Sequence, residues 1–444
     1  MSVVPVTLRR DPLDVLASLA REPGAFLLEI PDETRPFVLL GCSPVAELCL
    51  AESTPGDCLS RIERFVAETP LADPMLPFPL RGGVVGCLGY ELGRVIEPPR
   101  DGFTPRGELP LAILRRYDPI VAYDRSRRQY ALLCADPGAA RAPWLERLAA
   151  PVPAWDGPLG GPLVPLLPPA RYRESVERIL EYLAAGDVYQ VNLTQPFTAP
   201  LIAPAWILAA RFAGQHPVPY GAYLDLGSAQ LVANSPELFL RRRGRRVETR
   251  PIKGTRPRGD GPSHDLALAA ELLHDPKERA EHVMIVDLER NDLGRVCEVG
   301  TVVVERYAAV ESHPTVHHLV STISGRLRTD VGLADLLRAT FPGGSITGAP
   351  KVRAMEIICE LEAWSRGPYT GAFGLFDPRG DLELGLAIRT AIVSGGVVHY
   401  HAGGGIVADS DAGRESAEAW LKTAALRRAL GEEPRPGLVP CSSG

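Results

Sequence analysis

Short apolar runs and alternating hydrophobic and polar positions dominate the first third of the chain. Such runs are typical of strands, which are expected over residues 26–30, 37–40, 82–92, 113–123 and 130–134. Helices are expected over residues 13–21, 58–67 and 142–149. The pattern predicts a strand-rich half over residues 1–150.

Residues 151–169 are rich in proline and glycine, and few regular elements tolerate that density. We expect a crossing loop here, and Trp155 with several leucines favours a packed surface loop over a disordered tether. Beyond it, apolar residues recur at helical spacing from Val176 to Leu183, and Gly186 is placed to end that helix.

Alternation returns over residues 188–195 and predicts a strand whose polar side chains Gln190, Asn192 and Thr194 share one face. That face is either an exposed sheet surface or the polar wall of a pocket. Further strands are expected over residues 220–226, 231–233 and 238–240. Residues 431–444 are predicted to form a frayed tail.

Composition narrows the class of protein. The chain has 444 residues, 45% of them hydrophobic, which is enough for a large core. Its net charge of −6 argues against nucleic acid as the main partner. The arginine-rich run over residues 241–246 contains a glycine and is interpreted as the exposed tip of a hairpin.

The sequence also suggests a compartment. No apolar run is long enough to span a bilayer, and the first residues lack a signal-peptide core. The eight cysteines are scattered and form no CxxC pair or metal-ligand cluster. We therefore expect a cytoplasmic protein with reduced thiols and no membrane partner.

Lys253 lies in a segment, residues 251–259, that contains prolines and glycines and predicts a shaped loop rather than a helix or a central strand. Arg250, Arg256 and Arg258 flank the lysine. Neighbouring positive charges would favour its neutral amine, which is a nucleophile. A solvated basic loop is the alternative.

A glutamate pair lies on a helix predicted to begin at Asp275. Asp275 is a good N-cap residue, and Glu278 would complete a capping box. Glu278 and Glu281 are three residues apart, so they share one face of the helix.

A second pair, Glu415 and Glu418, lies on a helix predicted to follow residues 409–411, with Lys422 beyond it. Two such pairs can converge on Mg²⁺, which prefers a few carboxylates, several waters and a substrate oxygen. The alternative is that Glu278 only caps its helix and the other three glutamates are solvated.

Glycine-rich segments suggest a pocket for an anion. Residues 341–351 superficially suggest a phosphate loop, but no GK[ST] follows, which leaves a glycine-rich loop at a helix N-terminus as a general anion site. Residues 402–408 contain GxGxxA, but too little chain follows for a dinucleotide fold. Arg389, in a predicted apolar strand, is expected to have an anionic partner, either substrate or a carboxylate of the protein.

These features together predict an α/β enzyme with a Mg²⁺ site, an anion pocket and a candidate lysine nucleophile, acting on a small carboxylate. Its motifs also resemble those of a known family. They occur at residues 235–237, 251–259, 277–282, 285–295, 316–321, 342–356, 388–390 and 402–410. In this order they resemble the chorismate-utilising enzymes.

The resemblance is dense over residues 170–427 and weaker before them. It implies an α+β fold, a two-lobed antiparallel β-sandwich core flanked by helices. Residues 1–150 would supply one half of the sandwich and residues 170–430 the catalytic region, without two independent domains.

Two positions divide the family. Members that add water resemble one another in a lysine base where this chain has Gln190, which implies ammonia as the incoming group. Anthranilate synthases have alanine where this chain has Lys253. The lysine form is similar to the aminodeoxychorismate synthase component I branch, which aminates chorismate to 4-amino-4-deoxychorismate, a precursor of 4-aminobenzoate and folate.

The resemblance implies a role for each site residue. Glu281 and Glu418 would hold Mg²⁺, with Glu278 and Glu415 acting through waters. The residues around the ring carboxylate of chorismate would be Gly344, Ser345, Gly405 and Lys422. Those around the enolpyruvyl carboxylate would be Tyr369 and Arg389, with His318 near the ring.

The implied chemistry begins with Glu237, which would protonate the departing C4 hydroxyl, while Lys253 attacks C2. Ammonia would then add at C4 and displace the lysine. The chain has no recognisable glutaminase segment, so the resemblance implies a separate glutamine amidotransferase subunit in a heterodimer. Anthranilate synthase component I and a non-catalytic chorismate-binding subunit are the alternatives.

Overall fold

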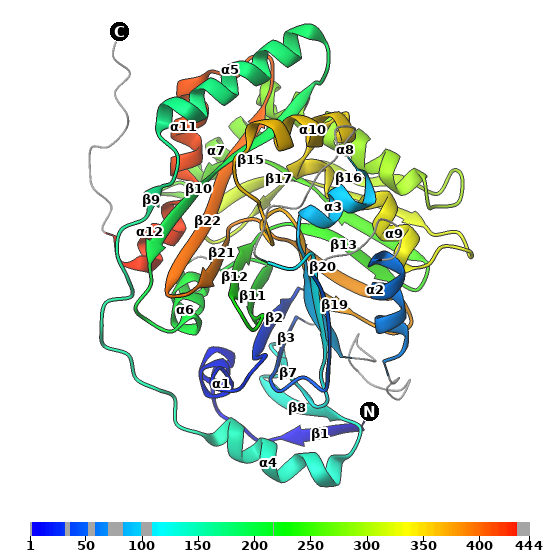
Figure 1. The fold of residues 1–444 in the computed structure, drawn as a ribbon, viewed down its shortest axis with the longest axis vertical. Coiled ribbons are helices and arrows are strands. Elements are labelled where there is room, and N and C mark those ends of the chain that lie inside the picture. The colour runs from blue at the N-terminus through cyan, green and yellow to red at the C-terminus, as the bar shows by residue number, and fades with distance from the viewer. Residues whose placement is uncertain are drawn as a thin grey trace.

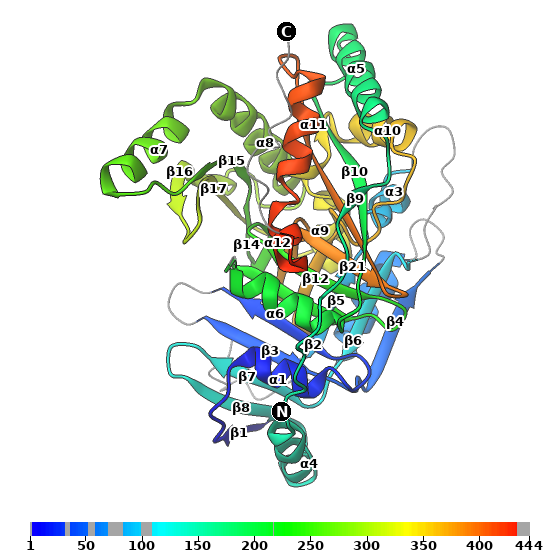
Figure 2. The ribbon, with the colours of Figure 1, turned by 90° about the vertical axis from the view of Figure 1, so that its left-hand side faces the viewer.

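Two large antiparallel sheets form the centre of the molecule (Figures 1 and 2). The computed structural model describes residues 2–31, 36–51, 58–69, 83–98, 109–215 and 217–432. Within these ranges the larger sheet has 12 strands and the smaller has 10.

The larger sheet has the order β1-β8-β7-β3-β2-β11-β12-β21-β22-β10-β18, with β9 paired to β10. Its strands, in chain order, are β1 (Ser2–Val6), β2 (Phe26–Ile30), β3 (Phe37–Gly41), β7 (Ile120–Asp124), β8 (Gln129–Cys134), β9 (Val164–Pro165), β10 (Gln190–Pro200), β11 (Tyr220–Asp225), β12 (Gln230–Ser235), β18 (Gly348–Ala349), β21 (Thr390–Ser394) and β22 (Val397–Ile406).

The smaller sheet has the order β15-β17-β14-β13-β20-β19-β5-β6-β4, with β16 paired to β17. Its strands are β4 (Ala46–Leu50), β5 (Val84–Leu88), β6 (Ala112–Arg116), β13 (Leu238–Arg243), β14 (Arg246–Arg250), β15 (Ile252–Pro257), β16 (Val303–Ser312), β17 (Val316–Arg326), β19 (Ala372–Phe376) and β20 (Leu382–Leu386).

Helices cover the outer faces of the sheets. They are α1 (Pro12–Leu19), α2 (Cys58–Ala67), α3 (Glu91–Ile96), α4 (Pro137–Ala149), α5 (Pro169–Ala185), α6 (Ala205–Gln215), α7 (Pro262–His274), α8 (Pro276–Gly294), α9 (Leu333–Thr340), the 3₁₀ turn η1 (Gly344–Ile346), α10 (Lys351–Leu361), α11 (Ala412–Leu421) and α12 (Ala424–Leu430). For the site, the important neighbours are α8 on β15 and β17, α10 on β10, and α11 on β22.

Both halves of the chain contribute to both sheets. In the larger sheet β2 of the first half pairs with β11 of the second, and in the smaller sheet β5 pairs with β19. The core between the sheets mixes the two halves in the same way, because Phe26 and Val85 pack in one cluster with Phe373 and Ile392. Burial of apolar side chains from both halves drives them to fold as one body.

Most predicted elements are present. The helix over 58–67 has the predicted bounds, and α5 ends at Gly186 in the left-handed region at φ 80°. The expected strand over 113–123 is two strands, because Asp118–Pro119 separates β6 from β7 and proline cannot donate to a ladder. The strand over 82–92 was too long, because β5 ends at Leu88 and α3 begins at Glu91. The turn after residue 31 and the tail beyond 432 lie largely outside the described residues.

The proline- and glycine-rich crossing segment packs against the body. It runs along the molecule from α4 to α5 (Figure 1), with Leu159 and Leu163 buried and Trp155 packed against the same cluster. Gly160 forms a bridge with Leu201, and a Cβ there would lie 2.1 Å from the carbonyl oxygen of Pro200. Glycine permits this close approach.

The basic run does form a hairpin tip, in which Gly244 has φ 60° between β13 and β14. Several of its arginines contact carboxylates, because Arg241 and Arg243 both contact Glu383 and Arg245 contacts Glu298. Among the described helices, none has the length and apolarity that a membrane span requires.

Candidate active site

Glu237 is a buried acidic residue of the candidate site. It follows β12, is 5% exposed, and accepts a hydrogen bond from the Ser345 hydroxyl at 2.6 Å. Burial raises the pKa of Glu237 to about 7, although Ser345, Lys253 and Arg389 each pull it down. A carboxyl group that still holds its proton near neutral pH suits a general acid.

Ser345 is brought to Glu237 by the glycine-rich loop. Gly344 and Ser345 lie in the single 3₁₀ turn η1, and a Cβ on Gly344 would lie 2.9 Å from Leu288 of α8. The next helix, α10, begins only at Lys351, which is paired with Asp292 at 2.5 Å. The glycines therefore precede the first turn of α10, as expected, but Lys351 is paired with Asp292, and an anion site in this loop stays a prediction.

Lys253 lies on a strand and not in a loop. It is the second residue of β15, at the end of the smaller sheet, and pairs with Leu319 of β17. The register shifts between Lys253 and Thr255, where Gly254 has φ 70°. The prediction of a loop is therefore wrong, because an edge strand accommodates a glycine at a bulge.

The flanking arginines do not crowd Lys253 with positive charge. Arg250 is paired with Glu311, Arg256 with Asp275 at 2.7 Å, and Arg258 with Asp265 at 2.6 Å. That part of the sequence interpretation is wrong, because each arginine forms an ion pair with its own carboxylate.

Carboxylates surround Lys253 instead. Its Nζ lies 3.6 Å from Oε2 of Glu281, and its side chain is 13% exposed. Its charge also lowers the pKa of Glu237, Glu278 and Glu418, although other causes are larger for each. Lys253 therefore lies between the buried acid and both glutamate pairs.

The first glutamate pair projects from α8 as predicted. Asp275 is the N-cap, and its carboxylate accepts from the backbone N–H groups of Lys277 and Glu278. Burial, followed by the charge of Glu281, raises the pKa of Glu278. Lys277 lies 3.9 Å from Glu281 on the same helix.

The second pair projects from α11, which begins after its N-cap Asp411. Glu415 accepts a hydrogen bond from Ser410 at 2.7 Å, and Lys422 lies 2.7 Å from Glu418. Both carboxylates approach the glycine strand β22, where a Cβ on Gly404 would lie 3.4 Å from Glu415 and 3.6 Å from Glu418.

The four glutamates satisfy the chemistry of a Mg²⁺ site but are not gathered around one point. No three histidine, cysteine, aspartate or glutamate side chains in the described ranges lie close enough to hold a metal ion. The two pairs do share cations, because Lys277 lowers the pKa of both Glu415 and Glu418, although burial is the larger influence on each. Carboxylate oxygens are the donors that Mg²⁺ prefers, so the donor set fits this ion by its chemistry.

Arg389 lies in a turn and not in a strand. It falls between β20 and β21, at φ 50°, a region that non-glycine residues rarely adopt. Burial lowers its pKa, whereas Tyr400 and Glu237 favour the charged form. Its half-buried guanidinium is therefore near the buried acid, and this unusual backbone conformation is typical of functional sites.

His318 and Tyr369 are both buried, and the charge of Arg389 acts on His318. His318 Nδ1 lies 3.0 Å from the Thr255 hydroxyl, and burial followed by Arg389 lowers its pKa to about 3. Its imidazole is therefore neutral at neutral pH. Tyr369 stacks on His401, with ring centroids 5.3 Å apart.

The polar face of β10 is buried and is not an exposed sheet surface. Gln190 is 0% exposed, and neither atom of its amide has a hydrogen-bond partner. Its side chain covers Gly405, where a Cβ would lie 2.9 Å away. Asn192 pairs with Gly405 across the ladder and donates from Nδ2 to the carbonyl oxygen of Ser345 at 3.4 Å. Buried amide groups without partners are unusual and indicate a place for a polar ligand.

Three buried charged residues near the site were not predicted from the sequence. Glu289 accepts a hydrogen bond from Thr249 at 2.9 Å, and burial followed by Glu237 raises its pKa to about 8. Glu362 and Arg366 form an ion pair of 2.6 Å. Glu289, Glu362 and Arg366 belong to no local sequence pattern that predicts burial.

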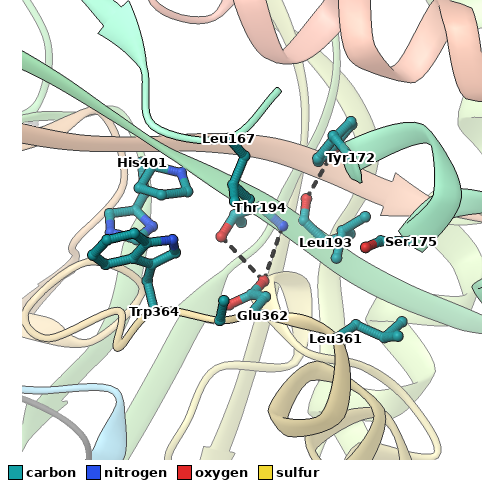
Figure 3. Close-up of a pocket in the computed structure, with 11 residues that line it drawn as sticks. Leu167, Tyr172, Ser175, Leu193, Thr194, Leu361, Glu362, Trp364 and His401 are labelled. Carbon is teal, nitrogen blue, oxygen red and sulfur yellow. Dashed lines mark hydrogen bonds between the residues drawn. The ribbon is translucent and has the colours of Figure 1, made fainter. Parts of the chain in front are cut away.

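A small surface pocket opens beside Glu362 (Figure 3). Its wall includes Thr194, Trp364 and His401, and the figure shows the two hydrogen bonds from Thr194 to Glu362. It lies outside the group formed by Glu237, Lys253 and the glutamate pairs, which remains the candidate active site.

Known proteins share this fold and sequence. A profile of chorismate binding enzymes matches residues 23–428. The chain is 41% identical over 401 residues to anthranilate synthase component 1 of Streptomyces coelicolor, covering 85% of this chain and 78% of the relative. It is 42% identical over 360 residues to aminodeoxychorismate synthase component 1 of Klebsiella aerogenes, covering 80% and 78%.

Among solved structures, anthranilate synthase component I from Streptococcus pneumoniae has a TM-score of 0.76 at 29% identity, over 95% of this chain and 94% of that one. The predicted mixed fold with antiparallel sheets is confirmed. The two kinds of component 1 resemble this chain to a similar degree.

Proposed function

The chain belongs to the chorismate binding enzyme family, and on that premise we propose that it aminates chorismate to 4-amino-4-deoxychorismate. The observation that carries the proposal is the position of Lys253. Its Nζ lies 3.6 Å from the carboxylate of Glu281, and its positive charge lowers the pKa of the buried acid Glu237. A lysine at this point can act as a nucleophile beside a proton donor.

In the first step the Nζ–C2 bond forms while the ring double bonds shift and the C4–O bond breaks. Glu237 gives its proton to the departing hydroxyl, which leaves as water. The pKa of Glu237 near 7 supports this role, because the acid keeps its proton at neutral pH. The attacking nitrogen loses one proton, which leaves the ring attached to Lys253 as a secondary amine.

In the second step ammonia forms a bond to C4, the double bonds shift back, and the C2–Nζ bond breaks. The incoming nitrogen loses one proton and the departing Nζ gains one, which restores the free amine of Lys253. Two successive displacements place nitrogen at C4, whereas one displacement would leave it at C2. Gln190 supports ammonia as the nucleophile, because its buried amide offers hydrogen-bonding atoms but no base to activate water.

Cationic and glycine-rich groups would hold the two carboxylates of chorismate. Arg389 and Tyr369 are assigned to the enolpyruvyl carboxylate and His318 to the ring edge. The ring carboxylate is assigned to Gly344, Ser345, Gly405 and Lys422. The uncharged state of His318 supports its place beside a ring rather than in an ion pair.

We assign Mg²⁺ to Glu281 and Glu418, with Glu278 and Glu415 acting through waters. A bound Mg²⁺ would neutralise and orient the ring carboxylate. The residues themselves supply carboxylates on two helices, α8 and α11, and lysines now balance their charge.

Ammonia requires a source, and the relatives named above are each component 1 of a synthase. We propose a glutamine amidotransferase subunit as partner, with the reaction serving 4-aminobenzoate and folate synthesis in the cytoplasm. Chorismate and ammonia are then the small-molecule partners of this chain.

Anthranilate synthase component I is the second candidate, because relatives of that name are as similar as those of the first. The purified chain with chorismate, Mg²⁺ and ammonium separates the two. We expect a product that becomes 4-aminobenzoate only after a lyase is added. Direct release of fluorescent anthranilate would establish the second candidate. Tight chorismate binding without turnover would indicate a non-catalytic subunit.

A further inference from the structure

Arg366 and Glu362 form a fully buried ion pair that the proposed chemistry does not use. Their side chains are 0% and 4% exposed. Removing two charges from water is costly, and apolar residues of similar volume often stabilise a fold as well or better. A buried pair therefore suggests a demand for geometry rather than for stability alone.

Every N–H donor of the Arg366 guanidinium is used. Nε and Nη2 donate to the two carboxylate oxygens of Glu362 at 2.8 and 2.6 Å. Nη2 also donates to the carbonyl oxygen of Asn192 at 2.7 Å. Nη1 donates to the carbonyl oxygen of Ile346 at 3.1 Å and to the Thr370 hydroxyl at 3.3 Å. A guanidinium has five such donors in a rigid plane, so the positions of these acceptors are fixed together.

Each acceptor is next to a residue assigned to chorismate. Asn192 is two residues from Gln190 on β10, where it pairs with Gly405 of β22. Ile346 follows Ser345. Thr370 follows Tyr369 and has φ 59°, which is a strained conformation for a β-branched residue.

The same pair connects the pocket to the first half of the chain. The backbone N–H of Arg366 donates to Glu91 of α3 at 2.9 Å, and its guanidinium lies 4.6 Å from the ring centroid of Tyr90. Glu362 in turn accepts from the backbone and hydroxyl of Thr194 at 2.9 and 3.1 Å, as Figure 3 shows.

We propose that Arg366, oriented by Glu362, is a positioning residue that sets the mutual placement of the β10 wall, the Ser345 turn and the Tyr369 turn around chorismate. It touches no substrate and acts through the backbone of these three segments. The proposal rests on chorismate as the substrate and does not depend on Lys253 chemistry.

The test replaces Arg366 by lysine, which keeps the charge but cannot supply five donors in one plane. Arg353→Lys is the matched control, because Arg353 also contacts two carboxylates, Asp187 and Glu356, and a tyrosine ring, but on the surface. Chorismate consumption is measured at saturating Mg²⁺ and ammonium, together with chorismate affinity and Tm.

We expect kcat/KM for chorismate to fall about 100-fold in Arg366→Lys, because displacement of about 1 Å can cost that much. KM should rise and kcat should fall. The decline of kcat as pH rises through about 7, where Glu237 loses its proton, should stay in place. Arg353→Lys should match the wild type. An unchanged kcat/KM in Arg366→Lys would overturn the proposal.

A second pair of variants keeps the test decisive if Arg366→Lys folds poorly. Thr370→Val removes one acceptor, whereas Thr370→Ser retains the hydroxyl. We expect Thr370→Val to raise KM several-fold and Thr370→Ser to restore it at equal Tm. Equal kinetics in the two variants, or losses that follow Tm alone, would show a purely structural role. Because the assay follows chorismate and not the product, release of anthranilate would refute the proposed function without affecting this comparison.

Discussion

Glu237 and the glutamates of α8 and α11 are the same kind of group in opposite surroundings. Glu237 is 5% exposed, and its hydrogen-bond partner is the neutral hydroxyl of Ser345. Glu281 and Glu418 lie within reach of lysines at 3.6 and 2.7 Å. The pKa of Glu237 is raised by burial, whereas lysines outweigh burial and lower that of Glu418.

The difference shows how one residue type acquires two functions. A carboxyl group buried without a close cation keeps its proton and can give it away. A carboxylate balanced by lysine side chains stays charged and suits a metal ion. Lys253 connects the two regions, because it contacts Glu281 and its charge reaches Glu237.

The largest effect is expected when that connection is removed. Lys253→Ala should lower formation of the 4-amino product at least about 1,000-fold, because loss of a covalent nucleophile removes both displacements. Nitrogen should be diverted to C2 in the residual product. Product analysis by chromatography with chorismate, Mg²⁺ and ammonium measures this.

Lys277→Ala is the control for this variant. Lys277 lies 3.9 Å from Glu281, but its side chain is 52% exposed and it has no assigned covalent role. It should retain most activity. Equal losses in the two variants would mean that Lys253 acts only as a balancing charge.

Glu237→Gln should have the next largest effect on rate. An amide cannot protonate the leaving hydroxyl, so kcat should fall about 100- to 10,000-fold. In the wild type kcat should decline as pH rises through about 7, where Glu237 loses its proton. That limb should be absent from the profile of the variant, and its persistence would assign the acid to another residue.

The same substitution should stabilise the fold at alkaline pH. The raised pKa means that folded Glu237 holds a proton that the unfolded chain releases, so stability falls as pH rises from about 4.5 to about 7. The glutamine variant lacks this penalty and should be up to about 3 kcal/mol more stable at pH near 8.5. Denaturant unfolding at low and high pH measures the difference, which should vanish near pH 4.5.

Glu418→Gln should have the smallest effect at saturating metal. We expect the half-saturating Mg²⁺ concentration to rise at least about tenfold, because even groups behind metal ligands cost this much. Glu174→Gln, on exposed α5 and paired with Arg171 at 2.7 Å, is the control. An unchanged Mg²⁺ dependence would remove Glu418 from the metal site.

Local signals in the sequence were enough to place the helices that carry the glutamates. Asp275 and Asp411 cap α8 and α11, and Gly186 ends α5, because caps depend on residues within one turn. The spacing of the glutamates on each helix followed from the same periodicity. The family resemblance then identified Glu237 and Ser345, which the fold brings to 2.6 Å.

Long-range pairing could not be predicted in the same way. The charges around Lys253 depend on which carboxylates the fold brings to Arg250, Arg256 and Arg258. The turn at Arg389 was expected as a strand, because its apolar neighbours resemble one. The role of Arg366 was not predicted, because its contacts with Glu362 and Thr370, four residues away, gain their meaning only with the distant carbonyl groups of Asn192 and Ile346.

The central claim is that Lys253 becomes covalently attached to the ring of chorismate. Mass spectrometry of protein quenched after incubation with chorismate and Mg²⁺, without ammonia, tests it most directly. The account predicts an added mass equal to chorismate less one water, on the peptide that contains Lys253 and absent from Lys253→Ala. An enzyme that turns over with ammonium but carries no such adduct, or carries it on another residue, would contradict it.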